Sequence, residues 1–183
     1  MLIKDEFLRA AIARTLQLKE EEIDEKAMER LVSLSARSAG IISLEGLDTA
    51  VNLQYLDLCG NSIEDLDPIK DLREVEYLNL SKNMLRDIQA LRGYRQLLRL
   101  DISRNNLYTM DISAIAGMIN LEELNLERSK VDNLVYLENA KKLHKLYISI
   151  ENGPFPLSIL GTLNELKELH MNKMWLYDIA DLT

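Results

Sequence analysis

The sequence predicts an α/β repeat solenoid, a right-handed curved stack of short parallel strands preceded by a small helical cap. Three observations predict this fold. Leucine fills 35 of the 183 positions, whereas glycine fills only 7 and proline 3. The leucines recur with a period of about 22 residues over most of the chain, which is typical of repeat architectures. The first 30 residues lack this period and instead carry apolar residues at helical spacing.

The repeating unit begins with the pattern L-x-x-L-x-L-x-x-N-x-L, which is clearest between Leu53 and Ile63. Its first positions fall at residues 31, 53, 75, 97, 121, 143 and 166. Leu56 and Leu58 are two residues apart, so both point to one face of a short strand. Each strand is expected to pair with the equivalent strand of the next repeat, which gives a parallel sheet on the concave side. Stacking buries the apolar edge that a single repeat leaves open.

The remainder of each repeat is expected to turn away from the sheet and to close the core on the convex side. Asn61, Asn83 and Asn105 can hydrogen-bond backbone groups at the turn, whereas Ala39, Ser129 and Met174 interrupt this series. The convex side receives residues such as Leu66, Ile69 and Leu72, or Ile88, Leu91 and Tyr94, through extended or 3₁₀ turns. The pattern slips at residues 150–156, where we expect a bulge that is either a tolerated insertion or a contact loop led by Phe155.

Two segments at the ends differ from the repeats, which divides the chain into a helical cap (1–30) and about seven repeats (31–183), the last incomplete. Asp5 can cap a helix that carries Phe7, Leu8, Ala11, Ile12 and Leu16, and Asp24 can cap a shorter helix through Arg30. At the other end, Leu169, Met171 and Leu176 belong to an open apolar edge. We expect the chain to continue, to associate end to end through this edge, or to cover it with Trp175 and Tyr177.

Composition excludes several function classes. The net charge of −8 disfavours nucleic acid as a partner. The single cysteine, Cys59, can form neither an internal disulfide nor a zinc site by itself, and no apolar run is long enough to insert into a membrane. Residues 1–6 lack the apolar segment of a signal peptide, so the protein is expected in the cytoplasm unless a leader has been removed.

The repeat pattern resembles the leucine-rich-repeat family over residues 31–183. Within that family, the helical segment FLRAAIARTLQL, the following GIISLEGL (Gly40 to Leu47) and the 22-residue period are similar to the internalin type of bacterial surface proteins. This resemblance implies a non-catalytic protein-binding module that is secreted or attached to the cell surface and binds its ligand on the concave face. The chain shows no signal peptide or anchor, which leaves a cytoplasmic regulatory scaffold that holds a phosphatase or another enzyme as the alternative.

The predicted partner-binding surface consists of the outward side chains beside the strand leucines. These residues are Tyr55, Asp57, Tyr77, Asn79, Arg99, Asp101, Glu123, Lys145, Tyr147 and His170. Tyrosine and arginine are common binding anchors, and Asp57 and Asp101 are placed to select a basic group. The other interpretation is a cross-strand series that only stabilises the sheet. Cys59 is expected to be accessible on the same face.

No catalytic, metal-binding or cofactor-binding residues are predicted. The two histidines, His144 and His170, lie on different strands without a cysteine or histidine cluster. Glu168 and His170 are expected about 7 Å apart on one strand face, too far for direct hydrogen bonding. No phosphate-binding glycine motif occurs. An enzyme or a carbohydrate-binding protein whose chemistry lies in a further C-terminal part remains a third alternative.

Overall fold

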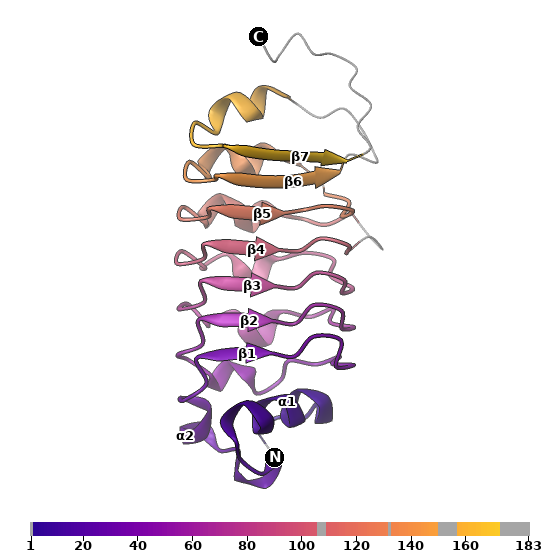
Figure 1. Cartoon of the computed structure of the whole chain (residues 1–183), viewed down its shortest axis with the longest axis vertical. Helices are drawn as coiled ribbons and strands as arrows, with labels where there is room; N and C mark the ends of the chain where they lie inside the picture. Colours follow the sequence, from indigo (N-terminus) through magenta and orange to yellow (C-terminus); the bar gives the residue numbers. More distant parts are fainter. Residues whose placement is uncertain (1, 106–108, 132, 150–156, 173–183) are drawn as a thin grey trace.

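The seven predicted strands form one parallel sheet in chain order. A computed structural model describes residues 2–105, 109–131, 133–149 and 157–172. The strands are β1 (Ser33–Ser35), β2 (Tyr55–Asp57), β3 (Tyr77–Asn79), β4 (Arg99–Asp101), β5 (Glu123–Asn125), β6 (Lys145–Ser149) and β7 (Glu168–Asn172). Each strand pairs with its sequence neighbours only, and the inward leucines Leu34, Leu56 and Leu78 are partners in register. The strands therefore stack along the long axis of the molecule (Figure 1).

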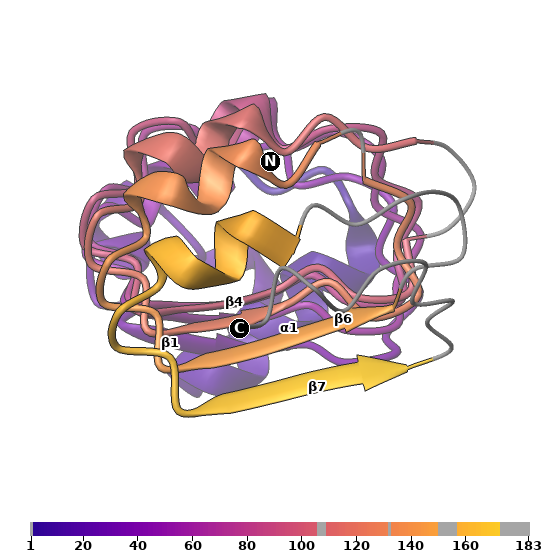
Figure 2. The same ribbon diagram turned by 90° about the horizontal axis from the view of Figure 1, so that it is seen from above.

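Short 3₁₀ helices cover the opposite side of the core, as Figure 2 shows for the view along the stack. They are η2 (Leu47–Thr49), η3 (Asp67–Ile69), η4 (Gln89–Leu91), η5 (Ser113–Gly117), η6 (Val135–Asn139) and η7 (Leu157–Thr162). These helices confirm the prediction of a convex side built from 3₁₀ turns. Leu66, Ile69 and Leu72, in and around η3, are all buried. Tyr94 is also fully buried, and its hydroxyl donates to the carbonyl oxygen of Ile69.

A series of buried polar side chains, here called the asparagine ladder, joins successive repeats where the chain leaves the sheet. The Oδ1 atom of Asn61 accepts hydrogen bonds of 3.0 Å from the backbone N–H groups of residues 39, 40 and 41 in the preceding repeat. Its Nδ2 atom donates to the carbonyl oxygens of Ala36 and Leu58. Asn83 and Asn105 repeat this pattern. The ladder thus satisfies backbone groups that burial would otherwise leave without a partner.

Ser129 replaces asparagine in the next repeat and still performs both roles. Its hydroxyl accepts from the backbone N–H of Asn105 at 3.1 Å and donates to the carbonyl oxygen of Ile102 at 2.8 Å. A hydroxyl reaches fewer backbone groups than an amide, so serine is a smaller version of the same bridge. Met174 and residues 150–156 lie outside the described residues.

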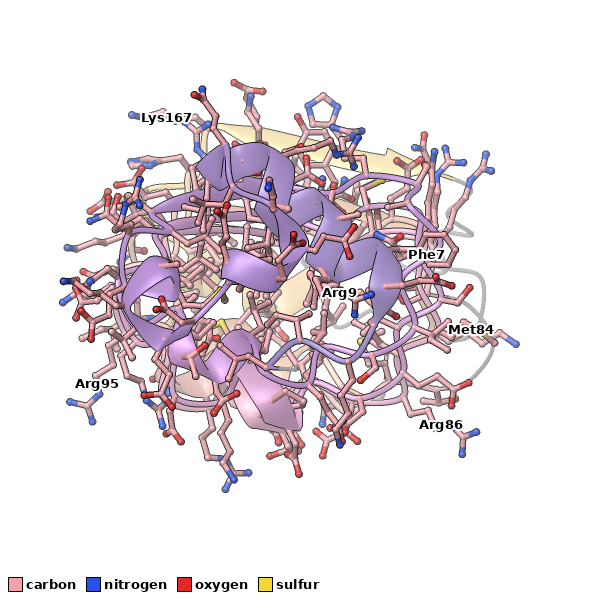
Figure 3. The ribbon with its side chains drawn as sticks, turned by 90° about the horizontal axis from the view of Figure 1, so that it is seen from below. Phe7, Arg9, Met84, Arg86, Arg95 and Lys167 are labelled. Atoms are coloured by element: carbon pink, nitrogen blue, oxygen red, sulfur yellow. The ribbon has the colours of Figure 1, made fainter. Side chains whose placement is uncertain are left out.

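The N-terminal segment forms a small helical unit below β1. It contains α1 (Glu6–Leu16), η1 (Glu20–Glu22) and α2 (Glu25–Met28). The second helix ends two residues before Arg30, because the chain leaves α2 through turn hydrogen bonds that already include Arg30 N–H to the Ala27 carbonyl. Arg9 lies beneath the sheet and pairs with Glu20 at 2.7 Å (Figure 3). No helix among the described residues is long and apolar enough to cross a membrane.

Asp5 connects this unit to the first repeat. One carboxylate oxygen accepts from the backbone N–H groups of Phe7 and Leu8 and so caps α1. The other oxygen accepts from Ile42 and Ser43 in the loop after β1. Burial by itself would raise the pKa of Asp5, but these four backbone hydrogen bonds outweigh it, and the pKa lies below its ordinary value.

We expect Asn83→Ala to lower the free energy of unfolding by about 3 kcal/mol, because several buried backbone groups lose their partner. Asn83→Ser should cost less, since Ser129 shows that a hydroxyl can bridge the same turn. Urea denaturation of the two variants and the wild type measures both effects. Equal stability of all three proteins would contradict the role assigned to the ladder.

We expect Asp5→Ala to lower the free energy of unfolding by about 2 kcal/mol at neutral pH, since a cap and a tertiary contact are lost together. The lowered pKa means that the charged carboxylate stabilises the fold above the unfolded-state pKa, which is near the ordinary value of 3.8. This contribution is lost as the pH falls through the still lower folded-state pKa. Denaturation curves should therefore converge between wild type and variant below about pH 4. A constant difference at all pH values would refute this explanation.

Candidate protein-binding surface

The register of the sheet aligns one outward side chain from every strand. The first outward column consists of Ser33, Tyr55, Tyr77, Arg99, Glu123, Lys145 and Glu168, each paired with its neighbour across the strands. Parallel strands lie about 4.8 Å apart, so adjacent members of the column are in contact range. All seven side chains are exposed or half-buried. The column is therefore a continuous row on the concave face.

Two stacked aromatic pairs lie on this face. The rings of Tyr55 and Tyr77 are 4.4 Å apart between centroids and 7° from parallel. The rings of Tyr147 and His170 are 4.4 Å apart and 10° from parallel. Burial and, to a smaller extent, the neighbouring Tyr55 raise the pKa of the Tyr77 phenol above its ordinary value, so the hydroxyl stays neutral. Stacking fixes these flat rings before any partner arrives.

Charged residues fill the rest of the row. Arg99 and Glu123 lie on β4 and β5, between the aromatic pairs, whereas Lys145 and Glu168 lie on β6 and β7, beside the second pair. Arg99 Nε lies 3.7 Å from Glu123 Oε2, and Lys145 Nζ lies 2.8 Å from Glu168 Oε2. The hydrogen bond to Glu168 raises the pKa of Lys145, and the same contact lowers the pKa of Glu168. Both groups therefore remain charged over a wide pH range.

Glu168 and His170 are closer than predicted. His170 Nε2 lies 3.6 Å from Glu168 Oε2, about half the expected separation. The prediction of 7 Å used the rise between alternate residues of a strand, whereas these two long side chains lean toward each other.

The second outward column has a structural role that the sequence analysis missed. In β2 to β5 the last strand residue, Asp57, Asn79, Asp101 or Asn125, accepts a hydrogen bond from the backbone N–H two residues later. Aspartate and asparagine favour this local turn, and four such residues in register were the signal for it. The predicted exposure of Asp57 and Asn79 is wrong, because only 1% and 6% of their surfaces are accessible.

Strand length follows from the residue at this position. Strands β2 to β5 each end after three residues, at the Asp or Asn whose side chain accepts from the backbone N–H two residues later. Tyr147 and His170 occupy the position in β6 and β7 and cannot make this turn. Those two strands continue for five residues, and Ile148 pairs with Met171 in the extension.

Asp57 already holds a basic group of its own chain. Its Oδ2 atom lies 3.1 Å from Arg37 Nη1, and its other oxygen accepts from the N–H of Cys59. Asp101 Oδ2 accepts from Asn125 Nδ2 at 3.2 Å. Cys59 is also buried, with 5% of its surface accessible, so the predicted accessibility of the thiol is wrong. The strand-end turn draws it against the sheet.

Arg99, Glu123, Lys145, Tyr147 and His170 lie where the sequence analysis placed them, together with Tyr55, Tyr77 and the half-buried Asp101. Their part in binding stays a prediction. The described residues contain no group of three or more histidine, cysteine, aspartate or glutamate side chains placed to hold a metal ion. Phe155, Trp175 and Tyr177 lie outside the described residues.

Comparisons with known proteins agree with this architecture. A family model described as leucine rich repeat matches residues 51–107. The crystal structure of internalin C2 from Listeria monocytogenes is similar, with a TM-score of 0.89 and 28% identity over 97% of this chain and 78% of the other. Internalin F of the same organism gives a TM-score of 0.75, with 24% identity over 97% of this chain and 59% of its own. No curated protein matches the sequence.

The repeat pattern, the seven-stranded sheet and the family match define a leucine-rich-repeat protein, and this fold is a protein–protein interaction module. The helical unit before β1 and the likeness to internalin C2 over nearly the whole chain narrow this class further. The chain is an internalin-like leucine-rich-repeat protein.

We expect Asn79→Ala to lower the free energy of unfolding by about 1–2 kcal/mol, because the buried N–H and hydroxyl of Ser81 both donate to its side chain. Asn79→Asp keeps the acceptor and should cost less. Thermal unfolding of both variants measures the difference. Unchanged stability of Asn79→Ala would contradict the structural role assigned to the second outward column.

Proposed function

We propose that the chain is a non-catalytic module that binds a protein ligand on the concave face, with Tyr55 and Tyr77 as the anchor. The observation that carries this proposal is the stacked, half-buried tyrosine pair on an otherwise open sheet face. Tyrosine provides a large, rigid contact area with a polar tip, and it is enriched among residues that dominate binding energy. Ordering these rings in advance lowers the entropy lost on binding.

The charged residues beside the anchor supply selectivity. Arg99 and Glu123 form a loose pair at 3.7 Å, so each keeps hydrogen-bonding capacity for a partner. Tyr147 and His170 give a second flat surface beside the other end of the row. The tightly paired Lys145 and Glu168 lie beside this second surface, on the same two strands. Such a row fits a protein surface that offers apolar contacts at two points and charged groups between them.

The similarity to internalin C2 supports a bacterial secreted or cell-surface protein. Its ligand is another protein, and a host protein fits this class.

Photo-crosslinking tests whether the concave face binds the ligand. A photo-reactive phenylalanine analogue in place of Tyr77 should capture the ligand, whereas the same analogue in place of the exposed convex residue Glu138 should not. Capture through Glu138 alone would move the binding surface to the convex side.

We expect Tyr77→Ala to weaken binding of the captured ligand by tenfold or more, which corresponds to about 1.4 kcal/mol or more. Tyr77→Phe keeps the stacked ring and is the matched control, so it should retain most of the affinity. Titration calorimetry measures binding, and circular dichroism checks the fold. Equal affinity of Tyr77→Ala and wild type would rule out the anchor.

A further inference from the structure

A column of basic side chains lies at one edge of the sheet, outside the concave face. In the turns after β1 to β5 the residue at one equivalent position has positive φ, and these residues form the turn column of Ser38, Gly60, Lys82, Arg104 and Arg128. Three consecutive members, Lys82, Arg104 and Arg128, are basic and exposed. The loops that carry them stack on one another along the edge where the strand arrows point (Figure 2).

The backbone at these positions does not favour the residues that occupy it. Lys82, Arg104 and Arg128 have φ values of 55°, 58° and 55°, in the left-handed region that glycine adopts without steric cost and asparagine tolerates. Gly60 satisfies this requirement. The backbone N–H of each turn residue donates to the next repeat, as in Lys82 to Ser103 and Arg104 to Glu127, whatever its side chain is. Folding therefore gains nothing from the long basic side chains.

The surroundings leave this charge available. Within the described part of the chain, Lys82, Arg104 and Arg128 have no ion-pair partner. The neighbouring acid Glu127 accepts a hydrogen bond from Asn172. Arg86, which extends from the same side of the molecule in Figure 3, pairs with Glu64 at 3.7 Å. This basic line exists on a chain whose net charge is −8, so it is a local feature rather than the general character of the surface.

We propose that Lys82, Arg104 and Arg128 form a docking line for an extended acidic segment of a protein partner. Three strands set the line at about 10 Å, which about three residues of an extended chain span. The three cations are in single file, whereas a membrane surface would be met by a broad basic face. The fold binds proteins, and the line borders the concave face, so one protein ligand can reach both. The line shares no residue with the concave-face anchor and does not depend on it.

The test uses a fluorescein-labelled oligoglutamate peptide of about eight residues, long enough to cover the line. Fluorescence anisotropy measures its binding to wild type and to a triple variant, Lys82→Asn, Arg104→Asn and Arg128→Asn. The matched control replaces Lys19, Lys26 and Lys70, which are exposed elsewhere, with asparagine and gives the same net charge. We expect the triple variant to bind about tenfold more weakly or worse, with a melting temperature equal to or above that of wild type.

Several results would overturn the proposal. Equal weakening in the control variant would mean that only net charge matters. Unchanged binding in the triple variant, or no peptide binding by wild type, would refute the proposed docking line. Wild-type binding to heparin or to phosphatidylserine vesicles, without peptide binding, would assign the line to a glycan or a membrane instead. Tyr77→Ala should bind the peptide normally, which separates failure of this line from failure of the concave-face anchor.

Discussion

Buried backbone at the turn out of each strand is the constraint on which the structure depends. A 22-residue coil must bring its chain across the core, and the peptide groups at that corner meet neither water nor a sheet partner. Asn61 resolves this with one amide that joins five backbone groups in two repeats. Each such bridge fixes one coil relative to the next. The stack is therefore held by polar contacts at one edge and by leucine packing between the sheet and the 3₁₀ helices.

This fixed offset between coils makes every repeat position a column. The same register that aligns Leu34, Leu56 and Leu78 in the core aligns Tyr55 with Tyr77 outside it and Lys82 with Arg104 at the edge. A column can serve the fold or remain free for recognition, and the physical state of its side chains separates these roles. In β2 to β5 the second outward column belongs to the fold, as at Asn79, which is buried and whose oxygen accepts from the backbone of Ser81.

The periodic part of the structure could be predicted from sequence because its cause is local and repeated. Leucine spacing predicted all seven strands, and Asp5 and Asp24 marked the starts of both helices. The exposure of Asp57 was not predictable from alternation alone, since a strand pattern assigns a side to each residue but not a hydrogen-bond partner. The pairing of Asp57 with Arg37 depends on the distance between two repeats, and the second contact of Asp5 depends on the docking of the cap.

The columns also separate residues that the fold requires from residues that it does not require. Where the backbone needs a particular residue type and the sequence supplies it, as with Asn83 in the ladder or Gly60 at the left-handed turn, folding explains the choice. Arg104 and Arg128 occupy the same turn against its steric preference, and no ion pair in the described chain offsets that cost. Tyr55 and Tyr77 stay half-buried on an open sheet face, although the core lies on the other side. The needs of folding do not explain these residues, and they lie on the two adjoining surfaces that we propose for contacts with another molecule.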